Sequence, residues 1–377
     1  MLFLVAAFGF AATGSKTAVA SDTNALNARS IDAYIETKML QGRIPGLQLA
    51  IVKRGELIYT KSYGLSNVHQ NSTVTNTTLF PINSITKAFT GIAVMQLVEM
   101  GKISLDSRVR VYLDDVPANW NDITVRDLLT HTSGIPEILD DNIKLIDGLA
   151  PDAAWAKIKT LPLIFKPGTK FQYTQTNYLV LGKIIDRVSG EAFAGFIKQG
   201  QFDRAEMTNT TFGHSGSSEG ADATMYTYLL LKIKDGQTIG VDRAKTLQLR
   251  QEVIPPYMRT AAGIDSTAID MAKWVIALEQ GKLLRKSSID ELWRPQRLPD
   301  GSYAQFNDLM NGYALGWPVI MRKQHAAVTP EGGERAAVFI YPKDDVAVIV
   351  LTNLMGGSPQ NFIDGIASHL IPGLTGR

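Results

Sequence analysis

The chain has 377 residues, no cysteine, and 38 basic against 36 acidic residues, for a net charge of +2. Its apolar fraction of 45% is enough for a sizeable core in one large or two closely packed domains. Without cysteine, disulfides, thiolate metal sites and cysteine nucleophiles are excluded. The charge balance gives no electrostatic reason to expect a nucleic-acid partner. The five histidines are scattered, with no pair at metal-ligand spacing, which disfavours a metalloenzyme.

The first twenty residues resemble an export signal. Residues 2–12 (LFLVAAFGFAA) are an uninterrupted apolar run too short to span a membrane, and Ala18-Val19-Ala20 is an A-x-A cleavage pattern. The run lacks the Lys or Arg that usually precedes it. We expect cleavage after Ala20 and a secreted or periplasmic protein with no stable membrane span afterwards. A cysteine-free chain suits a bacterial periplasm because its folding needs no oxidant.

In chain order, the first half begins with a predicted helix over 28–41 and a β-hairpin over 46–64. A strong helix follows over 85–102, where Gly101 can end it. Residues 104–135 alternate short helical pieces and turns.

The second half adds helices, one strand and a second hairpin. The strand over 226–239 runs into an Asp-Gly turn, and two hydrophobic strands form the hairpin over 336–354. Ser266 or Thr267 is available as the N-cap of one helix. Helices are predicted over 151–163, 177–199, 267–284 and 362–372.

Strands therefore lie near both termini, and helices crowd the middle. This order predicts an α+β fold whose α/β part takes in about 25–82 and 260–377, with a helical part and insertions over about 83–259. Residues 214–224 are the most loop-like segment.

Ser84 and Lys87 stand three residues apart at the start of the helix over 85–102. Such residues share a helix face, so the amine can reach the hydroxyl. A serine hydroxyl needs a base, and lysine serves once burial or positive potential lowers its pKa. The alternative is a serine N-cap followed by a solvated lysine. Ser-x-x-Lys is a common tetrapeptide, so the pattern alone favours that alternative.

Two further segments are equally ambiguous. Tyr173, before the helix over 177–199, is either a packing residue or a proton relay beside the serine and lysine. Gly332 and Gly333 precede a hydrophobic strand, where they form a plain turn or let a ligand approach the backbone closely.

Two apparent motifs are set aside. GHSGS (213–217) lacks the final glycine and the strand–turn–helix context of a G-x-S-x-G nucleophile elbow, so Ser215 is interpreted as a loop residue. His131, in LLTHTSG, is interpreted as a structural histidine bonded to nearby loop backbone.

Six segments in order resemble the serine β-lactamase and penicillin-binding-protein superfamily, especially its class C β-lactamases, D-Ala-D-Ala carboxypeptidases and β-lactamase-like esterases. They are FPINSITKAFTGIAVMQLVEMGKISLD, ITVRDLLTHTSGIP, FKPGTKFQYTQTNYLVLGKIIDRVSG, AAGIDSTAIDMAKWVIAL, YALGW and YPKDDVAVIVLTN. The resemblance implies one hydrolase domain over 21–377 with a β-lactamase/transpeptidase-like fold: an antiparallel sheet flanked by helices plus an all-helical domain.

The resemblance also implies roles for the site residues. Ser84 is the nucleophile, Lys87 its general base or proton shuttle, and Tyr173 the partner base and acid. The Ser84 amide is one oxyanion donor. Acyl transfer by this set requires no metal or organic cofactor.

The chain departs from the family pattern at two motifs. The family's Tyr-x-Asn is here Tyr173-Thr174-Gln175, which keeps the amide and adds a methylene. The family's third motif, Lys-Thr-Gly or His-x-Gly, is placed at Glu331-Gly332-Gly333. This placement makes the Glu334 amide the second oxyanion donor. The alternative places the motif at 327–329. Either way the motif's cation is missing. Glu331 would repel a substrate carboxylate, and Arg335 is the one candidate to substitute.

We therefore expect an exported serine hydrolase that forms an acyl-enzyme with ester or amide substrates, of carboxylesterase or D-amino-acid peptidase type. Within the class, the alternative is a class C-like β-lactamase or penicillin-binding DD-peptidase. From another class, the alternative is a catalytically silent binding protein on the same fold. Gln175 and Glu331 keep that alternative open, whereas Ser84, Lys87 and Tyr173 oppose it.

Overall fold

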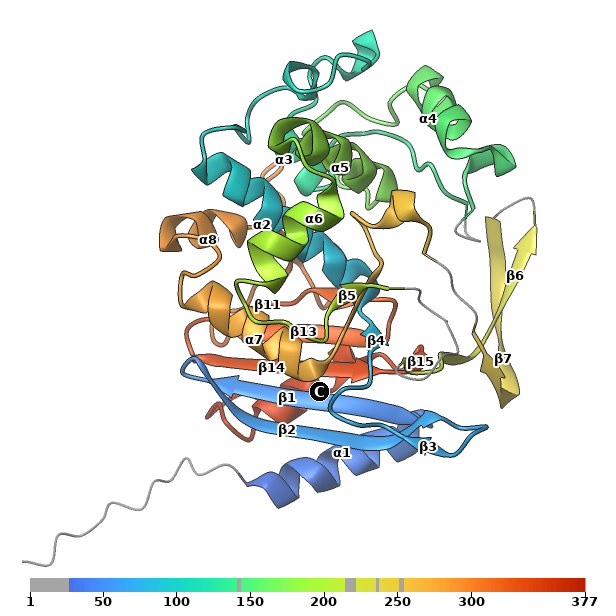
Figure 1. Ribbon diagram of the computed structural model, residues 1–377, viewed down its shortest axis with the longest axis vertical. Helices are drawn as coiled ribbons and strands as arrows, with labels where there is room; N and C mark the ends of the chain where they lie inside the picture. Colours follow the sequence, from blue (N-terminus) through green and yellow to red (C-terminus); the bar gives the residue numbers. More distant parts are fainter. Residues whose placement is uncertain (1–26, 141–143, 214–221, 235–236, 251–253, 377) are drawn as a thin grey trace, which may run out of the picture.

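The computed structural model describes residues 27–140, 144–213, 222–234, 237–250 and 254–376. Its main feature is a nine-stranded sheet, in the lower half of Figure 1, with strand order β3-β2-β1-β14-β13-β11-β10-β9 and β12 paired to β13. Strands from both ends of the chain meet at its centre, where β1 (Gly46–Lys53) pairs antiparallel with β14 (Val346–Thr352). The predicted α+β architecture is confirmed.

Alternate side chains of the central strands face two separate cores, as the pleat of a strand dictates. Leu47, Leu49 and Ile51 of β1 pack on the face covered by α1 (Ala28–Gly42) and α9 (Ile363–Ala367). Ala50 and Val52 face the core shared with α7 (Ala268–Glu279) and the helical part. The other strands of this sheet are β2 (Glu56–Asn67), β3 (Ser72–Thr73), β9 (Gly312–Tyr313), β10 (Pro318–Ile320), β11 (Ala327–Val328), β12 (Glu331–Gly332) and β13 (Ala336–Tyr341).

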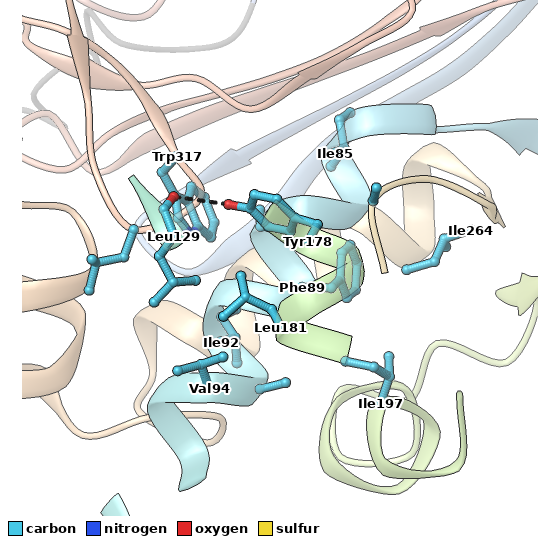
Figure 2. Close-up of a cluster of buried hydrophobic side chains, with 14 of the residues drawn as sticks. Ile85, Phe89, Ile92, Val94, Leu129, Tyr178, Leu181, Ile197, Ile264 and Trp317 are labelled. Atoms are coloured by element: carbon cyan, nitrogen blue, oxygen red, sulfur yellow. Dashed lines mark hydrogen bonds between the residues drawn. The ribbon is translucent and has the colours of Figure 1, made fainter. Parts of the chain in front are cut away.

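The helical part is built around α2 (Thr86–Glu99), which is buried along nearly its whole length and carries apolar residues on every side, as expected of a central helix. Figure 2 shows Phe89 and Ile92 of α2 meeting Tyr178 and Leu181 of α5 (Gln175–Ser189). The Tyr178 hydroxyl donates to the carbonyl oxygen of Leu129 at 3.1 Å. The other helices of this part are α3 (Val125–Leu129), α4 (Pro151–Thr160), α6 (Phe193–Ile197) and α8 (Lys286–Leu292).

Two small sheets join the parts. β8 (Ile264–Ser266) lies between β4 (Phe80–Pro81) and β5 (Thr211–Phe212), and this pairing fixes the chain just before Ser84 against residues 264–266. β6 (Tyr226–Lys234) and β7 (Gln237–Leu249) form the long hairpin on the right of Figure 1, and β15 (Leu354–Met355) pairs parallel to β6.

Most predicted elements are confirmed, and three helices differ from expectation. The helix predicted over 267–284 ends at Glu279. The predicted helix over 177–199 is broken at Gly190, which ends α5 in the left-handed conformation (φ 80°) because glycine has no Cβ to clash there. The helix predicted over 362–372 is regular only over Ile363–Ala367. Thr267 is the N-cap of α7, and its side chain accepts from the Asp270 amide at 3.1 Å.

Three predicted features lie outside the described residues: the export signal over 1–20, most of the loop over 214–224 including Ser215, and the Asp-Gly turn at 235–236. Within the described ranges, no helix has the length and apolar character needed to cross a membrane. The same ranges contain no group of three or more His, Asp or Glu side chains placed to hold a metal ion.

Candidate active site

Ser84 lies in η1 (Asn83–Ile85), a single 3₁₀ turn that leads into α2. The backbone there is held to β8, since the Ile82 amide donates to the Ile264 carbonyl at 3.0 Å. The N-cap of α2 is Ile85, which has no side-chain cap, so the interpretation of Ser84 as an N-cap is wrong. The Ser84 hydroxyl instead bonds to the side chains of Lys87 and Tyr173.

Lys87 is a buried amine directed at the Ser84 hydroxyl. Its Nζ donates to Ser84 Oγ at 3.0 Å and to the Ala261 carbonyl at 2.9 Å, and the residue is 1% exposed. The faces of the Tyr173 and Tyr178 rings lie 4.8 Å and 5.4 Å from the amine. Burial lowers the pKa of Lys87 from 10.5 to about 7. At neutral pH a large share of Lys87 is therefore uncharged, which is the form that accepts a proton.

Tyr173 completes a cluster of three hydrogen-bonding side chains. Its phenol bonds to Ser84, while burial, with smaller contributions from the charges of Glu331 and Glu137, raises its pKa above the ordinary value. Its ring packs on His131 with centroids 4.3 Å apart. The phenol therefore keeps its proton at neutral pH and can exchange it through the hydroxyl rather than act as a tyrosinate.

His131 packs against the ring of Tyr173 and bonds to the segment that carries it. Its Nδ1 accepts from the Thr174 amide at 3.2 Å and lies 3.2 Å from Asn177 Nδ2. Burial, with the charge of Lys87, holds the pKa of His131 well below its usual range, so the ring is neutral. His131 is thus a structural residue bonded to loop backbone, as predicted, and the backbone it bonds is that of the segment carrying Tyr173.

Glu137 is a site residue that sequence reasoning missed. Its carboxylate accepts from the backbone amides of Ile138 (2.8 Å), Leu139 (3.2 Å) and Gln175 (2.7 Å). The last of these bonds places a negative charge at the N-terminus of α5, where it is favourable. Glu137 also acts on Lys87, whose pKa it raises against the effect of burial. The only sequence signal was an acidic residue after the TSGIP segment, and no local pattern links that position to Lys87.

Neutralising Glu137 should alter the pH dependence of catalysis. In Glu137→Gln, Lys87 loses the charge that raises its pKa, so the acid limb of the kcat/KM profile should move to lower pH. The measurement is kcat/KM against pH for both proteins with one ester substrate. An unmoved acid limb in a folded variant would show that Glu137 only holds the backbone.

Gln175 is the first residue of α5, two positions after Tyr173. Its backbone amide is bonded to Glu137 at 2.7 Å. Its side-chain oxygen, Oε1, is buried and has no hydrogen-bond partner within the part of the chain that the structure describes. The amide kept from the family's second motif thus has an oxygen that no described residue pairs.

The proposed third motif lies against the Ser84 turn. β12 packs on η1, and a Cβ added to Gly332 would overlap the Ile82 carbonyl oxygen and lie 2.9 Å from the Ser84 amide nitrogen. Gly333 and Glu334 then form a tight turn with φ of 57° and 51°, closed by the Arg335 amide donating to the Gly332 carbonyl at 3.1 Å. Residues 327–328, the alternative register, instead form β11 between β10 and β13.

The charged residues around this turn differ in their surroundings. Burial, with the charge of Glu334, raises the pKa of Glu331 to about 7, and its Oε2 has no hydrogen-bond partner among the described residues. Glu334 is exposed, and its carbonyl accepts from the Ser358 amide at 2.8 Å. Arg335 is buried, and its Nε donates to the Gly333 carbonyl at 3.3 Å. The role of the Glu334 amide as an oxyanion donor stays a prediction.

Gly332 should not tolerate a side chain. Gly332→Ala forces β12 away from the Ser84 turn, so we expect a loss of about 1–3 kcal/mol of stability and reduced labelling of Ser84 by an acyl-transfer probe. Gly195→Ala is the matched control, because an added Cβ in α6 meets nothing within 4 Å there and alanine favours a helix. Equal stability of both variants in urea would contradict the close approach.

Most of the chain matches a known protein family. The model for the family described as Beta-lactamase matches residues 31–371. The chain belongs to the Beta-lactamase family. The predicted superfamily and the β-lactamase/transpeptidase-like fold are thereby confirmed, and members of the Beta-lactamase family are serine hydrolases.

Known proteins resemble this family member to different extents. Protein flp of Staphylococcus aureus strain NCTC 8325 / PS 47 is 33% identical over 204 residues, 52% of this chain and 41% of flp, so the chain matches less than half of that relative. The octameric penicillin-binding protein homologue from Pyrococcus abyssi is 26% identical with a TM-score of 0.72, over 89% of this chain and 75% of that chain. The hydrolase EstCE1 is 20% identical with a TM-score of 0.69, over 87% of this chain and 94% of the EstCE1 chain. EstCE1 therefore shares the fold.

Proposed function

We propose that this family member is an exported serine hydrolase that forms an acyl-enzyme on Ser84 with ester or amide substrates, of carboxylesterase or D-amino-acid peptidase type. The observation that carries the proposal is the 3.0 Å contact between Ser84 Oγ and the buried Lys87 amine. A lysine with a pKa of about 7 is matched to proton transfer at neutral pH.

The cluster supports a two-step reaction. Ser84 Oγ bonds to the substrate carbonyl carbon while its proton passes to Lys87, and the oxyanion lies at the start of α2, where the Ser84 amide and the helix N-terminus stabilise it. Tyr173 then delivers a proton to the leaving group as the carbon–leaving-group bond breaks, and Lys87 reprotonates the phenol. Water attacks the acyl-enzyme with the same residues in reversed roles and releases the acid and Ser84.

The substrate preference rests on the third motif. The cation that the motif usually supplies for a substrate carboxylate is replaced by Glu331. A carboxylate there disfavours β-lactams and D-Ala-D-Ala peptides, which carry such a group. This favours esters, or amides without a free carboxylate, over the class C-like β-lactamase or DD-peptidase alternative.

Covalent probes and chromogenic substrates test these assignments. A fluorophosphonate probe should modify Ser84, and a short-chain p-nitrophenyl ester should turn over rapidly while nitrocefin is hydrolysed negligibly. Absence of an adduct on Ser84 with both the fluorophosphonate and a labelled penicillin would favour a catalytically silent binding protein. Rapid nitrocefin turnover would favour the β-lactamase alternative.

The proposed export has its own test. The mature protein recovered from the periplasmic fraction or the medium should begin at Ser21, as cleavage after Ala20 requires. A protein that keeps residues 1–20 in the cytoplasmic fraction would contradict it.

A further inference from the structure

Two polar side chains beside the Ser84 cluster are left without a role by the reaction described above. Gln175 Oε1 and Glu331 Oε2 are buried and have no hydrogen-bond partner within the described ranges. An amide oxygen and an ionised carboxylate oxygen are both acceptors. Buried acceptors are rarely left unpaired, because the desolvation cost is not recovered until a donor arrives.

These two residues lie on different elements, and each is close in the chain to a residue that contacts Ser84. Gln175 opens α5 two positions after Tyr173, whose phenol is bonded to Ser84. Glu331 precedes Gly332, the residue whose backbone lies against the Ser84 amide, and its charge acts on Tyr173. A substrate group between α5 and β12 would therefore lie next to the carbonyl that Ser84 attacks.

The surrounding charges favour a cation at this place. The pKa of Lys87 is about 7, so much of it is uncharged at neutral pH, and the Glu137 carboxylate accepts from three backbone amides. Glu334 lies exposed on the turn, and the buried Arg335 donates to the Gly333 carbonyl. Glu331 is thus an acidic group on β12, which packs on the Ser84 turn, and one of its carboxylate oxygens is unpaired among the described residues. An ammonium group has a positive charge and several hydrogen-bond donors, and therefore complements unpaired, negatively charged acceptors.

We infer that Glu331 and Gln175 form a subsite for a protonated amine of the substrate, so that the enzyme prefers acyl groups with an ammonium next to the scissile carbonyl. The inference rests on the proposed acyl transfer by Ser84 and deepens it by naming the substrate class. Burial raises the pKa of Glu331 to about 7 in the free protein, and the bound ammonium favours its ionised form. Gln175 Oε1 accepts a second N–H of the same group.

A pair of isosteric substrates measures this preference. Alanine p-nitroanilide and isobutyryl p-nitroanilide share a leaving group and differ by an ammonium in place of a methyl group. We expect Glu331→Gln to lower the ratio of their kcat/KM values by about tenfold or more, because one charge at short range is removed from a partly buried site. Glu56→Gln removes the same charge from an exposed position in β2 and should leave the ratio within about twofold.

A competition assay on the unaltered enzyme gives a second readout. It does not require that a variant folds or that the enzyme hydrolyses an anilide. Alaninamide should slow fluorophosphonate labelling of Ser84 at lower concentration than isobutyramide does. Equal protection by the two amides, or an unchanged ratio in folded Glu331→Gln, overturns the amine subsite and leaves the proposed function standing. Absence of any labelling at Ser84 overturns the proposed function and the subsite with it.

Discussion

Replacement of Ser84 by alanine is expected to abolish fluorophosphonate labelling and to lower ester turnover by about 10³-fold or more, since removal of a nucleophile leaves only binding and electrostatic stabilisation. Ser84 lies in a 3₁₀ turn and caps no helix, so the variant should fold normally. Circular dichroism and intact-protein mass spectrometry after probe treatment are the measurements.

The control for this variant is Ser302→Ala. Ser302 is exposed, and its hydroxyl bonds only locally, to Asp300 at 2.6 Å. This variant should be labelled and should turn over esters like the unaltered protein. An undiminished adduct in Ser84→Ala would place the nucleophile elsewhere and remove the basis of the proposed mechanism.

Lys87→Met should lower kcat/KM by about 10²–10⁴-fold, because Ser84 loses the group that takes its proton. In the unaltered protein, kcat/KM should rise with pH through about 7, as the buried amine loses its own proton and becomes a base. The acid limb should vanish from the residual activity of the variant. A limb that persists unchanged near pH 7 would assign that titration to another group, and Glu331 is the first candidate.

The same substitution should stabilise the fold. The pKa of Lys87 is about 7 in the folded protein and 10.5 in the unfolded chain, so folding at neutral pH either buries a charge or releases a proton. This cost is greatest at and below pH 7 and disappears as the pH rises through 10.5. Methionine removes it, which should raise the free energy of unfolding by a few kcal/mol at pH 7 and by progressively less at higher pH.

Urea unfolding at several pH values between 6 and 10 measures the stability gain. A more stable but inactive Lys87→Met protein would separate the catalytic defect from misfolding. A destabilised variant at pH 7 would show that the bonds of Lys87 to Ser84 and Ala261 outweigh the cost of burying the amine.

The elements that the sequence predicted well are those with strong local signals. The helix that follows Ser84 and the two strands of the hairpin over 336–354 are long apolar runs bounded by turn residues, which local sequence alone reveals. The short C-terminal helix was missed for the opposite reason, because its extent depends on the neighbours it packs on, as α9 does on β14 and α1. The end of α5 at Gly190 is a local signal that was overlooked, since the glycine takes the left-handed conformation and an added Cβ there meets nothing within 4 Å.

The sequence by itself determined the family and the α+β architecture, because six segments in order match one superfamily and the helix and strand patterns are local. Those six segments, and not the Ser-x-x-Lys spacing alone, also singled out Ser84 and Lys87. Only the tertiary structure decided the rest. It buried Lys87 and thereby lowered its pKa, it brought Glu137 and His131 to the segment of Tyr173, and it placed Gly332 against the Ser84 amide. These effects depend on desolvation and on contacts between residues far apart in the chain, which no local pattern encodes.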